Sequence, residues 1–286
     1  MSITTSADLT AVPSTPRRHR PGLRRGWIGR SAWRLLIASL YLFLLAPVLV
    51  VIAMSFDSQS YLSFPPKGFT LDWYARLTEN TAFIRGFQVS LVVGVCTAAL
   101  ATAVGVPAAL ALVRHRFRGH DAVSSLFLAP LMVPTVVLGL ALLLTLSPWG
   151  LTGSYPGLVL AHFAITIPYV VRTTAMSLLT ADLSCEEAAQ ILGANGWTTF
   201  RRVTLPLARP GILAGAVIAF IISFDEAVIS LFVVGPSATT LPVEIYKYVQ
   251  YRSDPQIAAL SVVLIGISLL VVVVIERVVG LGRALR

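Results

Sequence analysis

Charged side chains are scarce in this sequence. They make up 12% of its 286 residues, whereas an ordinary soluble domain contains about 25%. Hydrophobic residues make up 56%, and the mean hydropathy is +0.80. This balance excludes an ordinary soluble domain and predicts an integral membrane protein.

Cysteine and lysine are nearly absent as well. The two cysteines, Cys96 and Cys185, have no metal-ligand spacing, so we expect unpaired thiols and no metal site. The two lysines, Lys67 and Lys247, do not belong to a Gly-x-x-x-x-Gly-Lys-[Ser/Thr] phosphate loop, and neither Gly-x-Ser-x-Gly nor His-Glu-x-x-His occurs. We therefore expect a non-enzymatic chain with no catalytic residues and no bound cofactor.

Long apolar runs are what the sequence has instead. About 20 consecutive apolar residues cross the hydrocarbon core as a helix, and six segments reach this length. They are residues 35–54, 87–113, 122–146, 157–176, 211–234 and 257–275. The prediction is an all-α integral membrane protein with six transmembrane helices in residues 35–286 and a core at 87–275. Residues 1–34 are an Arg-rich cytoplasmic tail that we expect to be disordered.

The positive charges predict the orientation of these spans. The net charge is +9, and most arginines lie in the tail, between the second and third spans, between the fourth and fifth, and after the sixth. Basic residues concentrate on the cytoplasmic side, so both termini are expected in the cytoplasm of a bacterial inner membrane. The charges do not gather on one amphipathic face, so they indicate membrane lipid rather than nucleic acid as a partner.

Four prolines interrupt the expected spans, at Pro107, Pro130, Pro134 and Pro168. Each removes a backbone donor and kinks a helix. Two interpretations remain open: ordinary kinks in a packed bundle, or a bundle shaped around a translocation path.

The longest expected cytoplasmic connection, residues 177–210, is predicted to form two short helices. Ser184 and Glu187 have the spacing of a capping box at the start of the first helix. Gly193 can adopt the left-handed conformation that ends it, and Asn195 can cap the second helix. The segment is therefore predicted to form a helical hairpin outside the membrane.

The second helix of this hairpin is predicted to have an apolar stripe. Trp197, Phe200 and Val203 recur every three residues and so share one helix face, and Pro206 is expected to end the helix. Large aromatic side chains exposed outside a membrane are typical anchors of protein interfaces. We therefore expect the hairpin to bind a partner protein.

Two adjacent carboxylates, Asp225 and Glu226, interrupt the fifth apolar segment. An aspartate at the centre of a span costs roughly 2.5–3.5 kcal/mol, so these residues are expected to face a cavity or a partner charge. Two hypotheses stay open: a cation-attracting point on a translocation path, or an outer-end charge paired with another subunit. His162, in the fourth span, is expected to be a packing histidine, with a proton relay as the alternative.

The hairpin resembles the signature loop of binding-protein-dependent ABC importer permeases. A Glu-Ala-Ala triplet is followed after three residues by glycine and after nine more by Val-x-Leu-Pro, between the fourth and fifth spans as in that family. The matching residues are Glu187, Ala188, Ala189, Gly193, Val203, Leu205 and Pro206. The resemblance covers roughly residues 35–280.

This resemblance implies a type I importer fold in which the loop is a cytoplasmic coupling helix. It implies that Glu187 contacts a separate ATP-hydrolysing subunit and that Gly193 forms the sharp turn; the alternative for Glu187 is that it only completes the capping box. The implied partners are a dimer of ATP-binding subunits, which holds ATP and magnesium, a second permease subunit and an external solute-binding protein.

Three further segments are similar to the spermidine/putrescine branch of that family: residues 62–74, 223–226 and 240–246. Polyamines have two or more positive charges, which suits acidic residues on the path, although Glu226 stands where the closest spermidine permeases have a second aspartate. The expected solute is therefore a polyamine such as putrescine or spermidine. An opine, an amino-acid-like or another small solute is the alternative, and a secondary transporter or channel is a remote rival.

Overall fold

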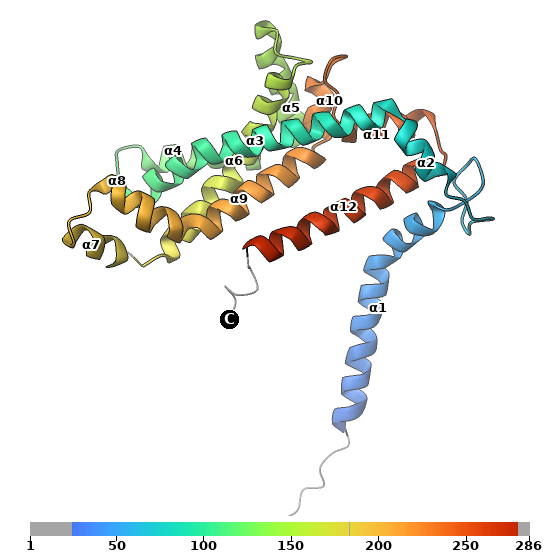
Figure 1. Ribbon diagram of the computed structural model, residues 1–286, viewed down its shortest axis with the longest axis horizontal. Helices are drawn as coiled ribbons and strands as arrows, with labels where there is room; N and C mark the ends of the chain where they lie inside the picture. The colour runs from blue at the N-terminus through green and yellow to red at the C-terminus, as the bar shows by residue number, and fades with distance from the viewer. Residues whose placement is uncertain (1–24, 183, 280–286) are drawn as a thin grey trace, which may run out of the picture. The chain divides into compact units, whose positions relative to one another are not determined.

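The computed structural model describes residues 25–182 and 184–279, and the named elements within them are all helical (Figure 1). They are α1 (Arg25–Met54), α2 (Asp72–Glu79), α3 (Thr81–Arg114), α4 (His120–Leu128), α5 (Thr135–Leu146), α6 (Tyr155–Thr180), α7 (Ser184–Ile191), α8 (Gly196–Thr199), α9 (Leu205–Asp225), α10 (Val228–Val233), α11 (Leu241–Tyr251) and α12 (Gln256–Val279). Two 3-10 turns, Ala129–Met132 and Ser147–Trp149, and one π-helical turn, Phe200–Thr204, complete the set. The predicted all-α class is confirmed.

The described part of the chain divides into two units, with the boundary between residues 49 and 50. Helix α1 begins at Arg25, so residues 25–34, which the sequence assigned to the tail, are helical. The rest of that tail, residues 1–24, lies outside the described residues. No residue of the apolar segment Ala32–Met54 is buried, which suits a helix in contact with lipid.

The core of the second unit consists of α3, α6 and α9, which pack against one another in pairs. Gly215 on α9 permits a close approach, because a Cβ there would lie 2.5 Å from Thr173 Oγ1 and 3.0 Å from Val170 Cα on α6. Ala101 of α3 and Ala219 of α9 are fully buried with Val170. Small residues let the backbones of membrane helices approach closely, so backbone packing holds these three helices together.

The predicted spans are helical, but they are not six straight ones. Four segments are long and apolar enough to cross a membrane: Ala32–Met54, Thr81–Arg114, Tyr155–Thr180 and Gly196–Asp225. The third predicted span is bent by 109° between His120–Met132 and Thr135–Trp149, where Pro130 and Pro134 remove backbone donors. The sixth is α12, Gln256–Val279, of which the stretch Gln256–Leu270 counts as a shorter apolar helix. Within the described residues the count is therefore four spans, or five with the bent pair.

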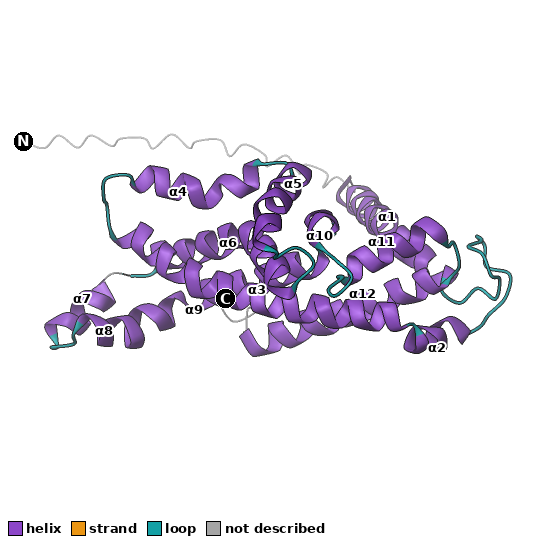
Figure 2. Cartoon of the chain, turned by 90° about the horizontal axis from the view of Figure 1, so that it is seen from above, coloured by secondary structure: helices purple, strands orange, loops and turns teal. Residues whose placement is uncertain are grey.

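The two ends of the second unit contain different loops, with α7 and α8 at one end and α2 at the other (Figure 1, Figure 2). In the loop before α2, the buried Asp57 carboxylate accepts hydrogen bonds from Ser63 Oγ at 2.5 Å and from the Lys67 backbone N–H at 3.2 Å. These donors, Ser63 above all, hold the pKa of Asp57 below its ordinary value. Trp73 on α2 donates its indole N–H to the Asp57 carbonyl at 2.7 Å. Asp57 therefore organises the first loop that resembles the polyamine branch.

Candidate functional site

The connection between α6 and α9 folds as the predicted hairpin, which comprises residues 184–204. Helix α7 ends in a Schellman turn, in which Ala194 N–H donates to Ala189 O at 3.0 Å and Gly193 N–H donates to Gln190 O at 2.9 Å. Gly193 has φ +88°, the left-handed conformation that this turn requires. The turn gives a physical reason for the spacing of the signature, because Ala189 supplies the accepting carbonyl and Gly193 the left-handed residue of one motif.

The start of α7 differs from the prediction. Helix α7 begins at Ser184 itself, and the Asp182 carboxylate accepts the Ser184 backbone N–H at 2.9 Å. This bond lowers the pKa of Asp182, and a carboxylate is favourable at a helix N-terminus. Asp182 thus takes the place of the expected capping box, and Glu187 is left exposed. Asn195 caps α8 as predicted, accepting the Thr198 backbone N–H at 2.8 Å.

The prediction that Pro206 ends the second helix is wrong. Helix α8 continues through the π-helical turn into α9, so that Gly196–Asp225 is one helical segment. Pro206 lies in the first turn of α9. Its missing N–H is accommodated because the wider π turn before it already interrupts the regular hydrogen-bond ladder. The hairpin is therefore continuous with the helix that leads to Asp225.

The hairpin exposes an apolar surface that differs from the predicted stripe. Ile191, Leu192 and Trp197 are 86%, 88% and 69% exposed. Phe200 lies beside Trp197, with ring centroids 5.6 Å apart, but Phe200 and Val203 are half-buried. Sequence reasoning missed Ile191 and Leu192. The sequence pattern that could have indicated their exposure is a pair of large apolar residues directly before a helix-ending turn. The helix is too short to pack both side chains against the rest of the protein.

The remaining signature residues lie beside this surface or further along α9. Ala188 is exposed on α7, next to Glu187. Leu205 and Pro206 line a groove of about 340 Å³ together with Arg209 on the first turns of α9. The structure therefore spreads the signature over the hairpin and the start of the next helix.

The two adjacent glutamates of α7 have different surroundings. Glu186 Oε1 accepts hydrogen bonds from Arg114 Nη2 at 2.5 Å and from Thr204 Oγ1 at 3.0 Å. The side chains of Arg114 and Glu186 are 16% and 15% exposed. This network joins α7 to the end of α3 and to the π turn, whereas Glu187 is exposed. Sequence reasoning missed this use of Arg114, whose charge it attributed only to membrane orientation.

The fifth predicted span, 211–234, ends early in the structure. Helix α9 stops at Asp225 and α10 starts at Val228. Glu226 Oε1 accepts the Ile229 backbone N–H at 2.9 Å, so this carboxylate caps α10. Asp225 is exposed, and it belongs to none of the ion pairs formed within residues 25–182 and 184–279. The two acidic neighbours are thus one capping group and one exposed group.

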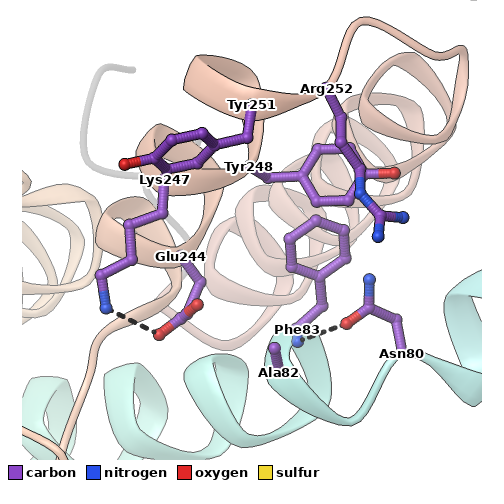
Figure 3. A pocket seen from close by; sticks show the side chains of 8 residues that line it. All are labelled: Asn80, Ala82, Phe83, Glu244, Lys247, Tyr248, Tyr251 and Arg252. Atoms are coloured by element: carbon purple, nitrogen blue, oxygen red, sulfur yellow. Dashed lines mark hydrogen bonds and ion pairs between the residues drawn. The ribbon is translucent and has the colours of Figure 1, made fainter.

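A pocket of about 220 Å³ lies between the start of α3 and α11 (Figure 3). Phe83 and Tyr248 form one wall, with ring centroids 5.0 Å apart, and the Arg252 guanidinium lies over the Tyr248 ring. At the rim, Lys247 Nζ is 3.3 Å from Glu244 Oε1. Two cations against one carboxylate disfavour a positively charged solute. Asp225 and Glu226 are not among the residues that line this pocket, so it does not coincide with the predicted acidic path.

Known proteins resemble the chain over most of its length. It is 35% identical to the spermidine/putrescine transport system permease protein PotC of Escherichia coli strain K12 over 246 residues, which are 86% of this chain and 93% of PotC. It is 36% identical to the putrescine transport system permease protein PotI of the same strain over 245 residues, 83% of this chain and 87% of PotI.

A solved structure has the same fold. The crystal structure of a bacterial ABC transporter involved in the import of the acidic polysaccharide alginate aligns with a TM-score of 0.67 at 18% identity, covering 90% of this chain and 97% of that one. The apolar helices and these relatives make the chain a multi-pass membrane protein. Residues 101–281 match the family described as binding-protein-dependent transport system inner membrane component, and the chain belongs to that family.

Proposed function

We propose that this chain is a permease subunit of an ATP-driven importer and that its hairpin docks on a dimer of ATP-binding subunits. The observation that supports this most directly is the exposed surface of Ile191, Leu192 and Trp197 beside the exposed Glu187. Fully burying a large apolar side chain is favourable by about 1.5–3 kcal/mol, so a docked partner stabilises this surface. The Schellman turn and the Arg114–Glu186 pair hold the surface in shape before docking.

The proposed assembly contains two further partners and separates transport from ATP chemistry. An external solute-binding protein, on which the family's description says such transport depends, and a second permease subunit complete it. ATP and magnesium bind to the partner ATPase subunits, because this sequence has no phosphate loop. The arginine distribution supports a bacterial inner membrane location with both termini in the cytoplasm.

We propose a polyamine, such as putrescine or spermidine, as the solute. The named solutes of PotC and PotI support this class. Asp225 supports it independently, because an exposed carboxylate at the end of a long apolar helix offers a counter-charge to a polycation crossing the membrane. Glu226 contributes less, since its carboxylate already caps α10.

The test is uptake of labelled putrescine and spermidine by the native cell with and without this gene. Deletion is expected to abolish uptake. The wild-type gene and Gln190→Ala, a control at an exposed position on the same helix, are expected to restore it, and Glu187→Ala is not. Asp225→Asn is expected to lower uptake while the ATP-binding subunit still co-purifies.

Two results would contradict these proposals. Unchanged uptake in the deletion strain would contradict a polyamine solute. A Glu187→Ala variant that imports at the wild-type rate with normal expression would contradict the docking role of that glutamate.

A further inference from the structure

The break between α9 and α10 is held by hydrogen bonds at its own backbone. Glu226 is the extended residue of the break, with φ −72° and ψ 108°. Its carbonyl accepts the Ser230 hydroxyl at 2.7 Å, and its carboxylate caps the Ile229 N–H. A break inside an apolar segment exposes backbone groups that need partners, and Ser230 supplies one of them.

His162 on α6 joins the two sides of this break. Its imidazole is fully buried, with Nδ1 2.8 Å from Ser223 Oγ near the end of α9 and Nε2 3.0 Å from Ser230 Oγ on α10. Ser223 and Ser230 are buried as well. One side chain of the neighbouring helix therefore contacts the helix that ends at Asp225 and the helix that follows it.

The order of the hydrogen bonds assigns the protons. The Ser230 hydroxyl donates to the Glu226 carbonyl, so Ser230 Oγ accepts from His162 Nε2–H. In a neutral imidazole with its proton on Nε2, Nδ1 accepts the Ser223 hydroxyl proton. The result is one directed series, Ser223 to His162 to Ser230 to the Glu226 carbonyl, with a neutral imidazole that uses both nitrogens.

The surroundings make this series costly to interrupt. Leu158 and Ile165, one turn on either side of His162, belong to a buried apolar cluster together with Ile229. A polar group left without a partner in such a place is destabilising. An apolar residue in place of His162 leaves both serines without their imidazole partner, so His162 does more than fill space.

We propose that His162 is a positioning residue of the transport path, which fixes the α9–α10 break and thereby the orientation of Asp225. This inference rests on the proposed function, in which Asp225 attracts the cationic solute. His162 itself does not contact the solute. It acts through Ser223 and Ser230, which lie on the two sides of the break.

The first test is hydrogen exchange of backbone amides in the assembled transporter in lipid nanodiscs. His162→Leu is expected to speed exchange of the α10 amides about tenfold relative to wild type, because a lost buried hydrogen bond changes a local opening equilibrium by that order. Thr166→Val is the matched control: Thr166 is one turn along α6, equally buried, and donates only within its own helix. It should leave α10 exchange unchanged.

This test does not depend on which solute is transported. No change at α10 in His162→Leu would overturn the proposal, as would faster exchange spread evenly over α6 and α9. If His162→Leu fails to assemble, Ser223→Ala is measured instead with the same expectation, because it removes the hydroxyl bonded to His162 Nδ1 and leaves the Ser230–Glu226 hydrogen bond in place.

The second test determines whether His162 affects uptake through the orientation of Asp225. Uptake is measured for His162→Leu, Asp225→Asn and the double variant. If His162 acts by orienting Asp225, His162→Leu lowers uptake at least threefold alone and adds little in the Asp225→Asn background. An equal fold-loss in both backgrounds would show a general packing role and overturn the proposal. Absence of polyamine uptake in wild type would instead contradict the proposed solute while leaving the exchange result standing.

Discussion

Arg114 Nη2 lies 2.5 Å from Glu186 Oε1, so the last residue of α3 is bonded to the first turns of α7 across 72 positions of sequence. Thr204 Oγ1 donates to the same oxygen. One carboxylate therefore connects the hairpin with the core helix α3 and with the turn that leads into α9. This contact couples the position of the hairpin to α3, whereas the continuous helix from α8 onward couples it to α9.

We predict that Glu186→Gln lowers stability more than Glu187→Gln. Glu186 is only 15% exposed and accepts a charged donor, and hydrogen bonds to charged groups contribute about 1.5–3 kcal/mol. Glu187 is exposed, where substitutions stay within about 0.5 kcal/mol. Thermal unfolding of the purified permease measures both. The double variant Arg114→Met/Glu186→Gln should lose less than the sum of its single changes; additive losses would show that the two side chains are not coupled.

The hairpin shows what the sequence could and could not predict. Gly193 and Asn195 were predictable because a left-handed turn and a helix cap depend on neighbouring residues alone. The Arg114–Glu186 pair was not, because it forms only when two distant helix ends meet. The early end of α9 at Asp225 was hidden for a similar reason. Apolar residues continue to position 234, and the break lies where His162 of another helix contacts Ser230.

Gly193→Ala is expected to destabilise the hairpin by about 1–2 kcal/mol. The φ of Gly193 is +88°. A residue with a Cβ is destabilised by roughly 1–2 kcal/mol in this left-handed region. Gly196→Ala is the matched control, since it lies at the start of α8 and its added Cβ would meet nothing within 4 Å. Exchange of the amides of α7 should rise in the first variant only. Equal behaviour of the two would show that the turn tolerates a side chain.

Gly215→Ala is expected to destabilise the α6–α9 pair. The new Cβ would lie 2.5 Å from Thr173 Oγ1 and 3.0 Å from Val170 Cα, and overpacking of this kind costs about 1–3 kcal/mol. Gly266→Ala on α12 meets nothing within 4 Å and should be neutral or stabilising by up to about 1 kcal/mol. Thermal unfolding in the same lipid compares them. A Gly215→Ala protein as stable as wild type would mean that the helices separate without cost.

Acid is expected to loosen the loop before α2. The pKa of Asp57 is lowered in the folded state by its hydrogen bonds, chiefly that from Ser63, so the stabilisation is complete above the ordinary aspartate value of about 4. It is lost as the pH falls through the lower folded-state pKa. The 19F resonance of 5-fluorotryptophan at Trp73, which donates to Asp57, reports the change. Asp57→Asn should show a shifted resonance that no longer responds to acid; a resonance that still moves would assign the transition to another group.

Trp197→Ala is expected to weaken docking without weakening the permease. Trp197 is 69% exposed, so its removal costs the isolated chain little, whereas large aromatic anchors at an interface typically contribute 2 kcal/mol or more, which is about a thirtyfold change in affinity. Ile191→Ser should act in the same direction, because Ile191 belongs to the same exposed surface. The measurement is co-purification of the ATP-binding subunit, with the thermal stability of the permease as the internal control. Leu144→Ser, at a side chain that is 66% exposed but lies on α5, should leave co-purification unchanged. Loss of the subunit in all three variants would mean that general exposure of apolar surface, and not this hairpin, decides the association.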